Sequence, residues 1–445
     1  MAALKLIVVA LRLKMDVKKP ILMPLFEEIA LKMTNPFEVK QIVLTSNGSL
    51  QNKIPWMDLS LATGYPGLLL LFATLESAGV VKEGAAHQYV LAIHQSIERE
   101  PLSNLSLYNG VSGICFALRQ ASHCGTRYQL MQQKLDNLLL EHIQDVYLKP
   151  LREHRKRQES APSALHDLIQ GLPGIGRYLL EDLSLFDATI ESILKELVEL
   201  SKPFFWEGRA VPGWHLSSHD HLNTRSKKWP KGNFNLGLAH GIPGILAFLS
   251  IATLKGVIID GQIDAMTRIA GWIQQHADRS SGMIQWHSMI PFEGEKDDVL
   301  ARDAWCYGVP GIARSLFLCG KALGDQDLVQ FAIDAFRGIF SRTREDWHLP
   351  GPMICHGIAG LLLITDAMAN DLKTQDLMSQ VEQLQQLLLA NYQPNAPFGY
   401  QDLQLAESGK WQAVNSPGLL EGTAGVLLTL LMPKTKWHLP FLINV

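Results

Sequence analysis

Stretches with apolar residues at three- and four-residue spacing recur along the chain. In residues 187–201, for example, Ile190, Leu194 and Leu197 alternate with charged and polar residues. This spacing places the apolar side chains on one face of an α-helix and the polar ones on the other. The same periodicity predicts amphipathic helices over residues 82–98, 131–149, 187–201, 261–277, 327–340 and 377–392.

A second pattern alternates with these stretches, a Gly-x-x-Gly step that leads into an almost wholly apolar run. One copy reads TGYPGLLLLFATL (63–75) and another HGIPGILAFLSIATL (240–254). The seven copies have their first glycines at positions 64, 110, 171, 241, 308, 357 and 422, which are 46 to 70 residues apart. We therefore expect seven repeats, each with an outer amphipathic helix, a loop, the glycine step and an apolar inner helix.

Inner helices that are apolar on nearly every side need burial on all sides, which favours a closed ring of repeats. The pattern thus predicts an all-α fold, an α/α toroid with seven inner and seven outer helices that spans residues 1–445 as one domain. An open helical array is the alternative. A small β-rich extension is expected within residues 201–239, where the helical period is absent, and residues 397–414 are typical of a hairpin.

Composition narrows the function classes. The 445 residues are 47% hydrophobic and 19% charged, and the formal charge is −3, so no strong electrostatic field indicates a nucleic acid or an acidic membrane as partner. Five cysteines are too few and too irregular for a disulfide framework, and they indicate a reducing compartment. The N-terminal apolar run, residues 6–11, is too short for a membrane span. We expect a cytoplasmic protein, with any membrane association arising through a larger complex.

Two cysteines occupy equivalent places in successive repeats. Cys306 and Cys355 each stand two residues before the first glycine of a step, and His240, Tyr307 and His356 each stand one residue before it. In a toroid these positions converge at one end of the barrel. Cys115, Cys124 and Cys319 lie within helical patterns instead, where a cysteine is normally an inert small hydrophobe.

Cys306, Cys355 and His356 form a ligand set suited to zinc. Zinc prefers four tetrahedral ligands, and three protein ligands with one open position is the arrangement of catalytic sites. A thiol that enters the open position loses its proton, because the metal stabilises the thiolate. The sequence therefore predicts one Zn²⁺ per chain and an enzyme that activates a substrate thiol.

A rival metal cluster lies in WHLSSHDHL, with His215, His219, Asp220 and His221. This stretch has no helical period to hold the side chains in place, and a solvated loop is the preferred interpretation.

The glycine repeats, together with WCYGVPG, CHGIAG and LAHGIPG, resemble the lanthionine cyclases, the LanC family. The resemblance covers nearly the whole chain. It implies an α/α toroid with a catalytic zinc on Cys306, Cys355 and His356. It also implies addition of peptide cysteine thiols to dehydroalanine or dehydrobutyrine, which forms the thioether rings of a lanthipeptide (lantibiotic). Because the repeats begin by residue 64, the chain resembles the stand-alone cyclases that act after a separate dehydratase.

The resemblance also assigns catalytic roles. His240 corresponds to the general acid/base, Asp167 to the family's aspartate, and Arg302 and Tyr307 to its arginine and tyrosine. Asp167 is matched by spacing alone, since His166 is adjacent. Arg302 is expected to hold an anionic intermediate, to fix Asp167 or simply to brace the barrel as a buried Arg–Asp pair. Tyr307 is expected to donate a hydrogen bond to the enolate or to pack.

The implied partners are a dehydrated precursor peptide with its leader, a dehydratase and an export transporter. The basic runs 149–160 and 225–232 are candidates for binding an acidic leader, although such runs are more often solvated surface. Other functions stay open. They are addition of glutathione to dehydroamino acids, in which case the Tyr307 position is expected to differ, a prenyltransferase-like subunit, and a non-catalytic scaffold. A toroidal glycosidase would need paired carboxylates, and the equivalent positions offer only Glu421 and Asp167.

Overall fold

The computed structural model describes residues 19–48, 50, 56–220, 222, 227–294, 300–406, 408–432 and 435–445. The N-terminal apolar run lies outside these residues, as do His221 and part of the basic run 225–232. The chain divides into two compact units. The first comprises residues 1–102, 117–129 and 350–437, and the second comprises residues 103–116, 130–349 and 438–445.

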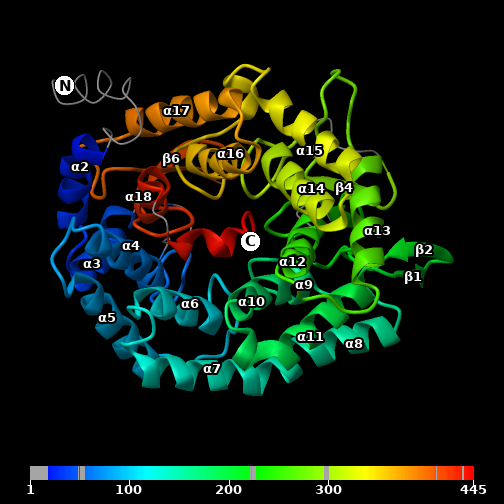
Figure 1. Cartoon of the computed structure of the whole chain (residues 1–445), viewed down its shortest axis with the longest axis horizontal. Coiled ribbons are helices and arrows are strands. Elements are labelled where there is room, and N and C mark those ends of the chain that lie inside the picture. Colours follow the sequence, from blue (N-terminus) through cyan, green and yellow to red (C-terminus); the bar gives the residue numbers. More distant parts are fainter. Residues whose placement is uncertain are drawn as a thin grey trace. The chain divides into compact units, whose positions relative to one another are not determined.

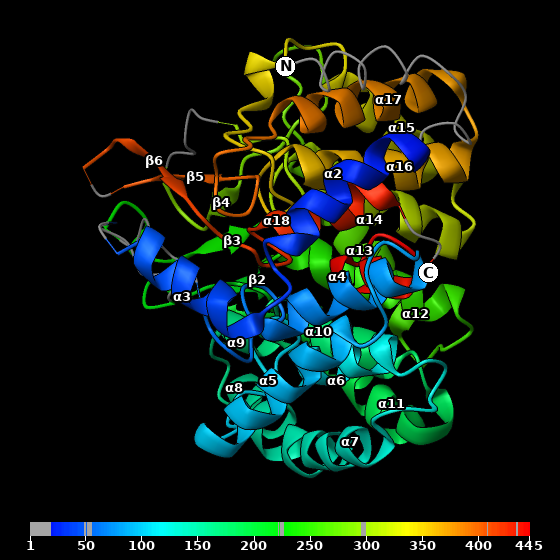
Figure 2. The same ribbon diagram turned by 90° about the vertical axis from the view of Figure 1, so that its left-hand side faces the viewer.

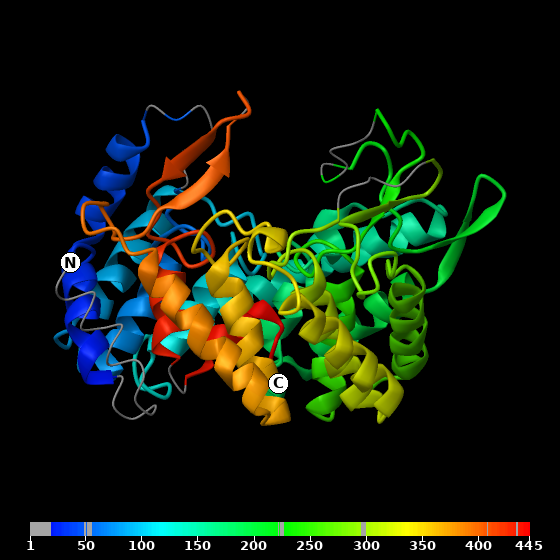
Figure 3. The same ribbon diagram turned by 90° about the horizontal axis from the view of Figure 1, so that it is seen from above.

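The first unit is built from helices and one hairpin (Figure 1). Its helices are α2 (Lys19–Leu31), α3 (Pro36–Ser46), α4 (Tyr65–Ser77), α5 (Ala85–Arg99), α16 (Ile358–Leu372), α17 (Gln375–Ala390) and α18 (Thr423–Leu431). Its strands β5 (Asp402–Leu405) and β6 (Trp411–Val414) pair antiparallel, which confirms the hairpin expected in residues 397–414. In Figure 3 this hairpin, in orange, extends away from the helices of the unit.

The second unit holds most of the remaining elements. Its helices are the π-helical turn Gln144–Leu148, α7 (Gln129–Ile143), α8 (Lys149–Lys156), α9 (Ser163–His166), α10 (Leu172–Leu179), α11 (Leu183–Leu200), α12 (Ile242–Leu254), α13 (Gln262–Gln275), α14 (Val309–Leu323), α15 (Gln326–Ile339) and the 3₁₀ turn Glu345–Trp347. Helix α6 (Val111–Ala121) and the 3₁₀ turn Lys436–Phe441 have residues in both units, and the first residue of α7, Gln129, belongs to the first unit.

The second unit also contains the predicted β-rich extension. Strands β1 (Pro203–Trp206) and β2 (Arg209–Pro212) form a hairpin, and β3 (Asn233–Asn235) pairs antiparallel with β4 (Met289–Pro291). Strands β1 to β3 therefore fall within residues 201–239, where the helical period was missing.

All seven predicted inner helices form, and each begins directly after the first glycine of its step. They are α4, α6, α10, α12, α14, α16 and α18. Gly308 shows why the step needs glycine. Its φ of 92° is in the left-handed region, and a Cβ at this position would lie 1.9 Å from the carbonyl oxygen of Arg302. Several of these helices have a proline in their first turn. It costs no hydrogen bond there, because the first N–H groups of a helix have no intrahelical partner.

The outer segments also form helices, with one difference. Residues 131–149 were expected to form one helix, but the structure has α7, a π-helical turn and then α8. Pro150, in the first turn of α8, has no N–H to continue the regular ladder, and the π turn takes up the mismatch.

The second glycine of a step lets neighbouring repeats approach closely. A Cβ at Gly174 would lie 3.0 Å from Cβ of Leu107, and one at Gly311 would lie 2.8 Å from Cβ of Leu238. In the first unit Gly67 meets Leu419 in the same way. Helix α18 accordingly packs on α4, so the last repeat contacts the first within this unit (Figure 2).

Backbone hydrogen bonds link the loops that precede the inner helices. In the second unit the N–H of Ala239 donates to the carbonyl of Cys306 over 3.3 Å. In the first unit the N–H of Cys355 donates to Leu420 over 3.0 Å, and the N–H of Leu420 donates to Ala62 over 3.0 Å. These bonds set the register between repeats, so the residue before each first glycine takes the same place in its repeat.

Candidate metal centre and catalytic residues

His240 and Asp167 form a closely held pair in the second unit. The Nδ1 of His240 lies 2.7 Å from Oδ2 of Asp167, whose side chain is fully buried, while 24% of the His240 side chain is exposed. Burial lowers the pKa of His240, but the hydrogen bond and negative charge of Asp167 outweigh it, so the net pKa is raised above its usual value. The imidazole therefore keeps a proton more readily than a free histidine does.

The Asp167 carboxylate is held rigidly by the backbone that follows it. Its Oδ1 accepts hydrogen bonds from the N–H groups of Gln170 at 2.6 Å and Gly171 at 3.1 Å. Both N–H groups belong to the turn that leads into α10. The carboxylate is thus fixed by its own repeat and directed at His240, which comes from the next repeat. Its neighbour His166 is buried, and burial lowers the pKa of that imidazole.

Cys306 and Tyr307 stand beside this pair, before α14. Cys306 is buried, and its thiol is close enough to His240 that a thiolate there raises the pKa of the imidazole. The Tyr307 hydroxyl accepts a hydrogen bond from Nδ2 of Asn235 over 2.9 Å. Both residues lie against Gly237, where a Cβ would meet the Tyr307 ring at 2.6 Å and the Cys306 carbonyl at 2.7 Å. Glycine at 237 therefore makes room for them.

Trp305 lies behind the Cys306 loop in a fully buried position. Its Nε1 donates to the carbonyl of Phe441 over 3.0 Å, and its ring lies 5.4 Å from that of Phe441 and 6.1 Å from that of Tyr108. The C-terminal segment thus supports the loop that carries Cys306.

Arg302 is exposed, so the expected brace formed by a buried Arg302–Asp167 pair is wrong. The next residue, Asp303, makes the buried pair instead, with Oδ2 2.6 Å from the guanidinium of Arg342. Burial raises the pKa of Asp303 to about 7 despite the charge of Arg342. One position along the loop therefore separates a structural aspartate from an arginine that is open to solvent.

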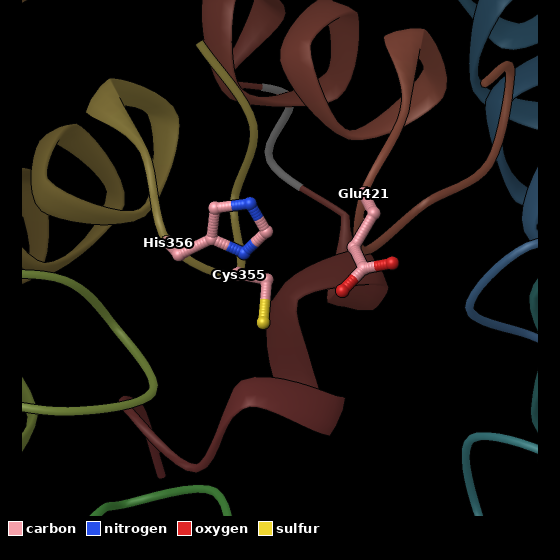
Figure 4. A group of neighbouring side chains, drawn as sticks. All are labelled: Cys355, His356 and Glu421. Carbon is pink, nitrogen blue, oxygen red and sulfur yellow. The ribbon is translucent and has the colours of Figure 1, made fainter. Parts of the chain in front are cut away.

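Cys355, His356 and Glu421 meet in the first unit (Figure 4). One ligand atom from each, the thiol sulfur, a ring nitrogen and a carboxylate oxygen, lies within 4.8 Å of the other two. Cys355 and His356 precede α16, and Glu421 precedes α18. Sulfur, imidazole nitrogen and carboxylate oxygen are the donors that zinc uses in proteins, so this set fits the expected metal.

Asp402, the first residue of β5, orients the His356 ring. Its Oδ1 lies 3.1 Å from Nε2 of His356, its side chain is fully buried, and its Oδ2 accepts from Gln404 over 3.0 Å. Histidines that bind metals usually donate their second ring N–H to such a carboxylate. Held in this way, His356 presents Nδ1 as its ligand nitrogen.

The sequence prediction of the site included neither Asp402 nor Glu421. Asp402 lies 46 residues beyond His356 and has no repeat signature. Glu421 did carry a signal, because it precedes a first glycine in the same way as His356. Cys306 belongs to the second unit, so its place in the metal site stays a prediction.

The rival histidine cluster is structural where the structure describes it. His215 is buried, with Nδ1 2.6 Å from the Ser160 hydroxyl and Nε2 2.9 Å from the Lys231 carbonyl. Asp220 accepts hydrogen bonds from the N–H and hydroxyl of Ser163, both over 2.8 Å, while His219 is exposed. His221 lies outside the described residues.

The other three cysteines differ from one another. Cys115 and Cys319 are buried in α6 and α14, as expected, and burial raises the pKa of Cys319 to about 12. The expectation of a helical position is wrong for Cys124, which lies exposed in a turn with φ 59°. The turn forms because α6 ends at Ala121 and glycine follows at position 125.

The arginines of the basic run 149–160 are held in ion pairs. Arg152 and Arg155 both contact the buried carboxylate of Glu196, at 2.6 and 2.9 Å, and Arg157 pairs with Glu159. These contacts favour a structural role for the run. No helix in the described part of the chain is both long and apolar enough to cross a membrane.

Comparisons with known proteins agree with the resemblance seen in the sequence. The family described as "Lanthionine synthetase C-like protein" matches residues 55–441. The nisin biosynthesis protein NisC of Lactococcus lactis subsp. lactis is 26% identical over 384 residues, which cover 84% of this chain and 85% of that protein.

A solved structure, nisin cyclase, superposes with a TM-score of 0.71 at 23% identity and covers 92% of this chain and 97% of its own. This similarity shows the fold, and it confirms the predicted α/α toroid class with its small sheets. Because the family match spans most of the residues, the chain belongs to the lanthionine synthetase C-like family.

Proposed function

We propose that this chain is a zinc-dependent lanthionine and methyllanthionine cyclase. It adds cysteine thiols of a dehydrated precursor peptide to dehydroalanine or dehydrobutyrine in the same peptide. The observation that carries the proposal is the convergence of Cys355, His356 and Glu421, with Asp402 holding the second nitrogen of His356. Family membership and the similarity to NisC support the reaction type.

In this proposal Cys306, Cys355 and His356 hold the zinc. When bound there, the metal would act as a Lewis acid and stabilise the thiolate form of a substrate thiol near neutral pH. Asp402 fixes the ring of His356, and Trp305 supports the loop of Cys306.

The reaction breaks the S–H bond of the thiol and the π bond of the carbon–carbon double bond, and it forms one carbon–sulfur bond and one carbon–hydrogen bond. The thiolate sulfur attacks Cβ of the dehydroamino acid, and the π electrons move to the carbonyl oxygen as an enolate. A donor near that oxygen lowers the barrier, and the hydroxyl of Tyr307, which Asn235 holds by a hydrogen bond to its oxygen, is the candidate for this role.

The proton must finally reach Cα of the attacked residue. His240 is suited to deliver it, because Asp167 raises the pKa of the imidazole and holds its Nδ1. Arg302 is exposed, and its role in this proposal is to hold an anionic intermediate rather than to fix Asp167. A dehydrated peptide with its leader is the expected substrate, with a separate dehydratase and an exporter as partners in the cytoplasm.

Zinc content is the first test. We expect about one zinc per wild-type chain and little in Cys355→Ala, since zinc needs its full ligand set. A peptide that carries one dehydroalanine and one cysteine then tests the reaction, with cyclisation scored by loss of the alkylatable thiol in mass spectrometry. Zinc that survives loss of Cys355, or a zinc-loaded chain that leaves the thiol free, overturns the proposal.

A further inference from the structure

Glu421 occupies the place in the seventh repeat that His356 occupies in the sixth. Each stands directly before the first glycine of its step, and the inner helices that follow, α16 and α18, pack against each other. The Cys355 N–H bond to the Leu420 carbonyl joins the two loops one residue earlier. The two side chains that follow are thus placed side by side by the backbone, independently of any metal.

The distances suit a shared ligand set. The carboxylate oxygen of Glu421 lies within 4.8 Å of both the Cys355 sulfur and a His356 nitrogen. With metal–ligand bonds of about 2.0–2.3 Å, two ligands of one tetrahedral zinc lie roughly 3.3–3.8 Å apart. Small side-chain rotations therefore bring all three atoms onto one ion.

The acidic groups around His356 also favour a bound cation. Two carboxylates, Glu421 and Asp402, and the thiol of Cys355 surround a single imidazole. Carboxylates in such a setting are unfavourable unless a positive charge compensates them, and a divalent metal does so.

We propose that Glu421 is a fourth ligand of the metal while no thiol substrate is bound. The carboxylate occupies the position that a substrate thiolate needs, so the two compete for it. This inference rests on the proposed function, because it takes the metal site from there. It adds a protein ligand that the set of Cys306, Cys355 and His356 lacks.

Cobalt substitution provides the test, since the visible spectrum of Co²⁺ reports its ligands without any turnover. Wild type and Glu421→Gln are loaded with Co²⁺ and titrated with 2-mercaptoethanol. We expect Glu421→Gln to bind the metal about tenfold or more weakly in chelator competition, because an anionic donor is lost. We expect the same variant to bind the thiol several-fold more tightly, because its competitor is gone.

Two controls keep the result specific. Glu76→Gln changes a half-buried glutamate of the same unit, whose Oε1 accepts from the Ala86 N–H, and it leaves both affinities unchanged. Asp402→Asn weakens metal binding without tightening thiol binding, because Asp402 orients a ligand and does not compete with the substrate. Should Glu421→Gln fail to fold by circular dichroism, Glu421→Asp replaces it. A carboxylate one methylene shorter makes a weaker ligand, so we expect tighter thiol binding there too.

An unchanged cobalt spectrum and unchanged thiol affinity in Glu421→Gln overturn this inference alone and leave the zinc cyclase in place. A wild-type chain that takes up neither zinc nor cobalt overturns the proposed function together with it.

Discussion

The two units carry different chemistry on the same repeat positions. In the first unit two of the residues before a glycine step, His356 and Glu421, lie with Cys355 as a group of potential metal ligands. In the second unit His240 and Tyr307 take such positions, where His240 pairs with Asp167 and Tyr307 accepts a hydrogen bond from Asn235. The difference teaches that one backbone device, the glycine step, presents whatever side chain precedes it. In the proposed mechanism, the identity of that side chain determines whether the position binds metal or moves a proton.

The carboxylates show the same division. Asp402 lies against a ring nitrogen of a proposed metal ligand, while Asp167 lies against a ring nitrogen of a proposed acid. Each aspartate fixes one nitrogen and leaves the other ring nitrogen for the chemistry. Substitutions in the two units should therefore separate metal binding from proton transfer.

The largest effect is expected from His240→Asn. Loss of the proton donor should lower the cyclisation rate by about 10²–10⁴-fold, the usual contribution of a general acid or base. Zinc content should stay at the wild-type level, since His240 is not a ligand in this scheme. The rate is measured by thiol alkylation of the zinc-loaded variant. A variant that loses its zinc as well would show that metal binding and proton transfer are not separated between the two units.

Cys306→Ala distinguishes the single thiol of the second unit from the donor group of the first. We expect its metal affinity to fall by more than the roughly 100-fold upper bound for outer partners, because a direct ligand is removed. Residual binding should exceed that of Cys355→Ala, since Cys355, His356 and Glu421 stay together. Competition with a chromophoric chelator measures both variants. If Cys306→Ala bound the metal as tightly as the wild type does, Cys306 would be excluded from the metal site.

Asp402→Asn tests the support of His356. The amide keeps the size of the side chain but loses its charge, so we expect metal affinity to fall by about 10–100-fold. Asp58→Asn is a matched control, because Asp58 binds Lys40 and Trp56 in the same unit. It should lower the melting temperature without changing metal affinity. If both variants lower the metal affinity by the same factor, the effect of Asp402 is only structural.

Asp167→Asn should produce the smallest change, a shift of the pH–rate profile. Asp167 raises the pKa of His240, so an enzyme that needs protonated His240 loses activity as pH rises through that raised pKa. Without the aspartate charge the pKa falls, and the alkaline limb of the profile should move to lower pH. Rates of cyclisation across a pH series at saturating zinc measure it. If the alkaline limb does not move, a group other than His240 donates the proton, and Tyr307 is the next candidate.

Local features of the sequence determined much of the fold and part of the site. Seven glycine steps predicted where seven inner helices begin, because close backbone approach and helix initiation depend on residues adjacent in the chain. The periodicity predicted the outer helices, and the absence of periodicity indicated the β-rich stretches. Cys355 and His356 could be singled out because they share a repeat position with Cys306 and His240.

Only the tertiary structure decided which side chains complete the site. Asp402 is brought to His356 by a hairpin, and Glu421 by a backbone bond between two repeats. Nothing within a few residues of Asp402 predicts its contact, and the repeat position of Glu421 singles out the residue without identifying its partners. The same holds for Arg302 and Asp303, where the direction of the loop leaves the arginine exposed and buries the aspartate against Arg342. A repeat pattern specifies local conformation, whereas contacts between distant residues depend on how the elements pack, and packing is a property of the whole unit.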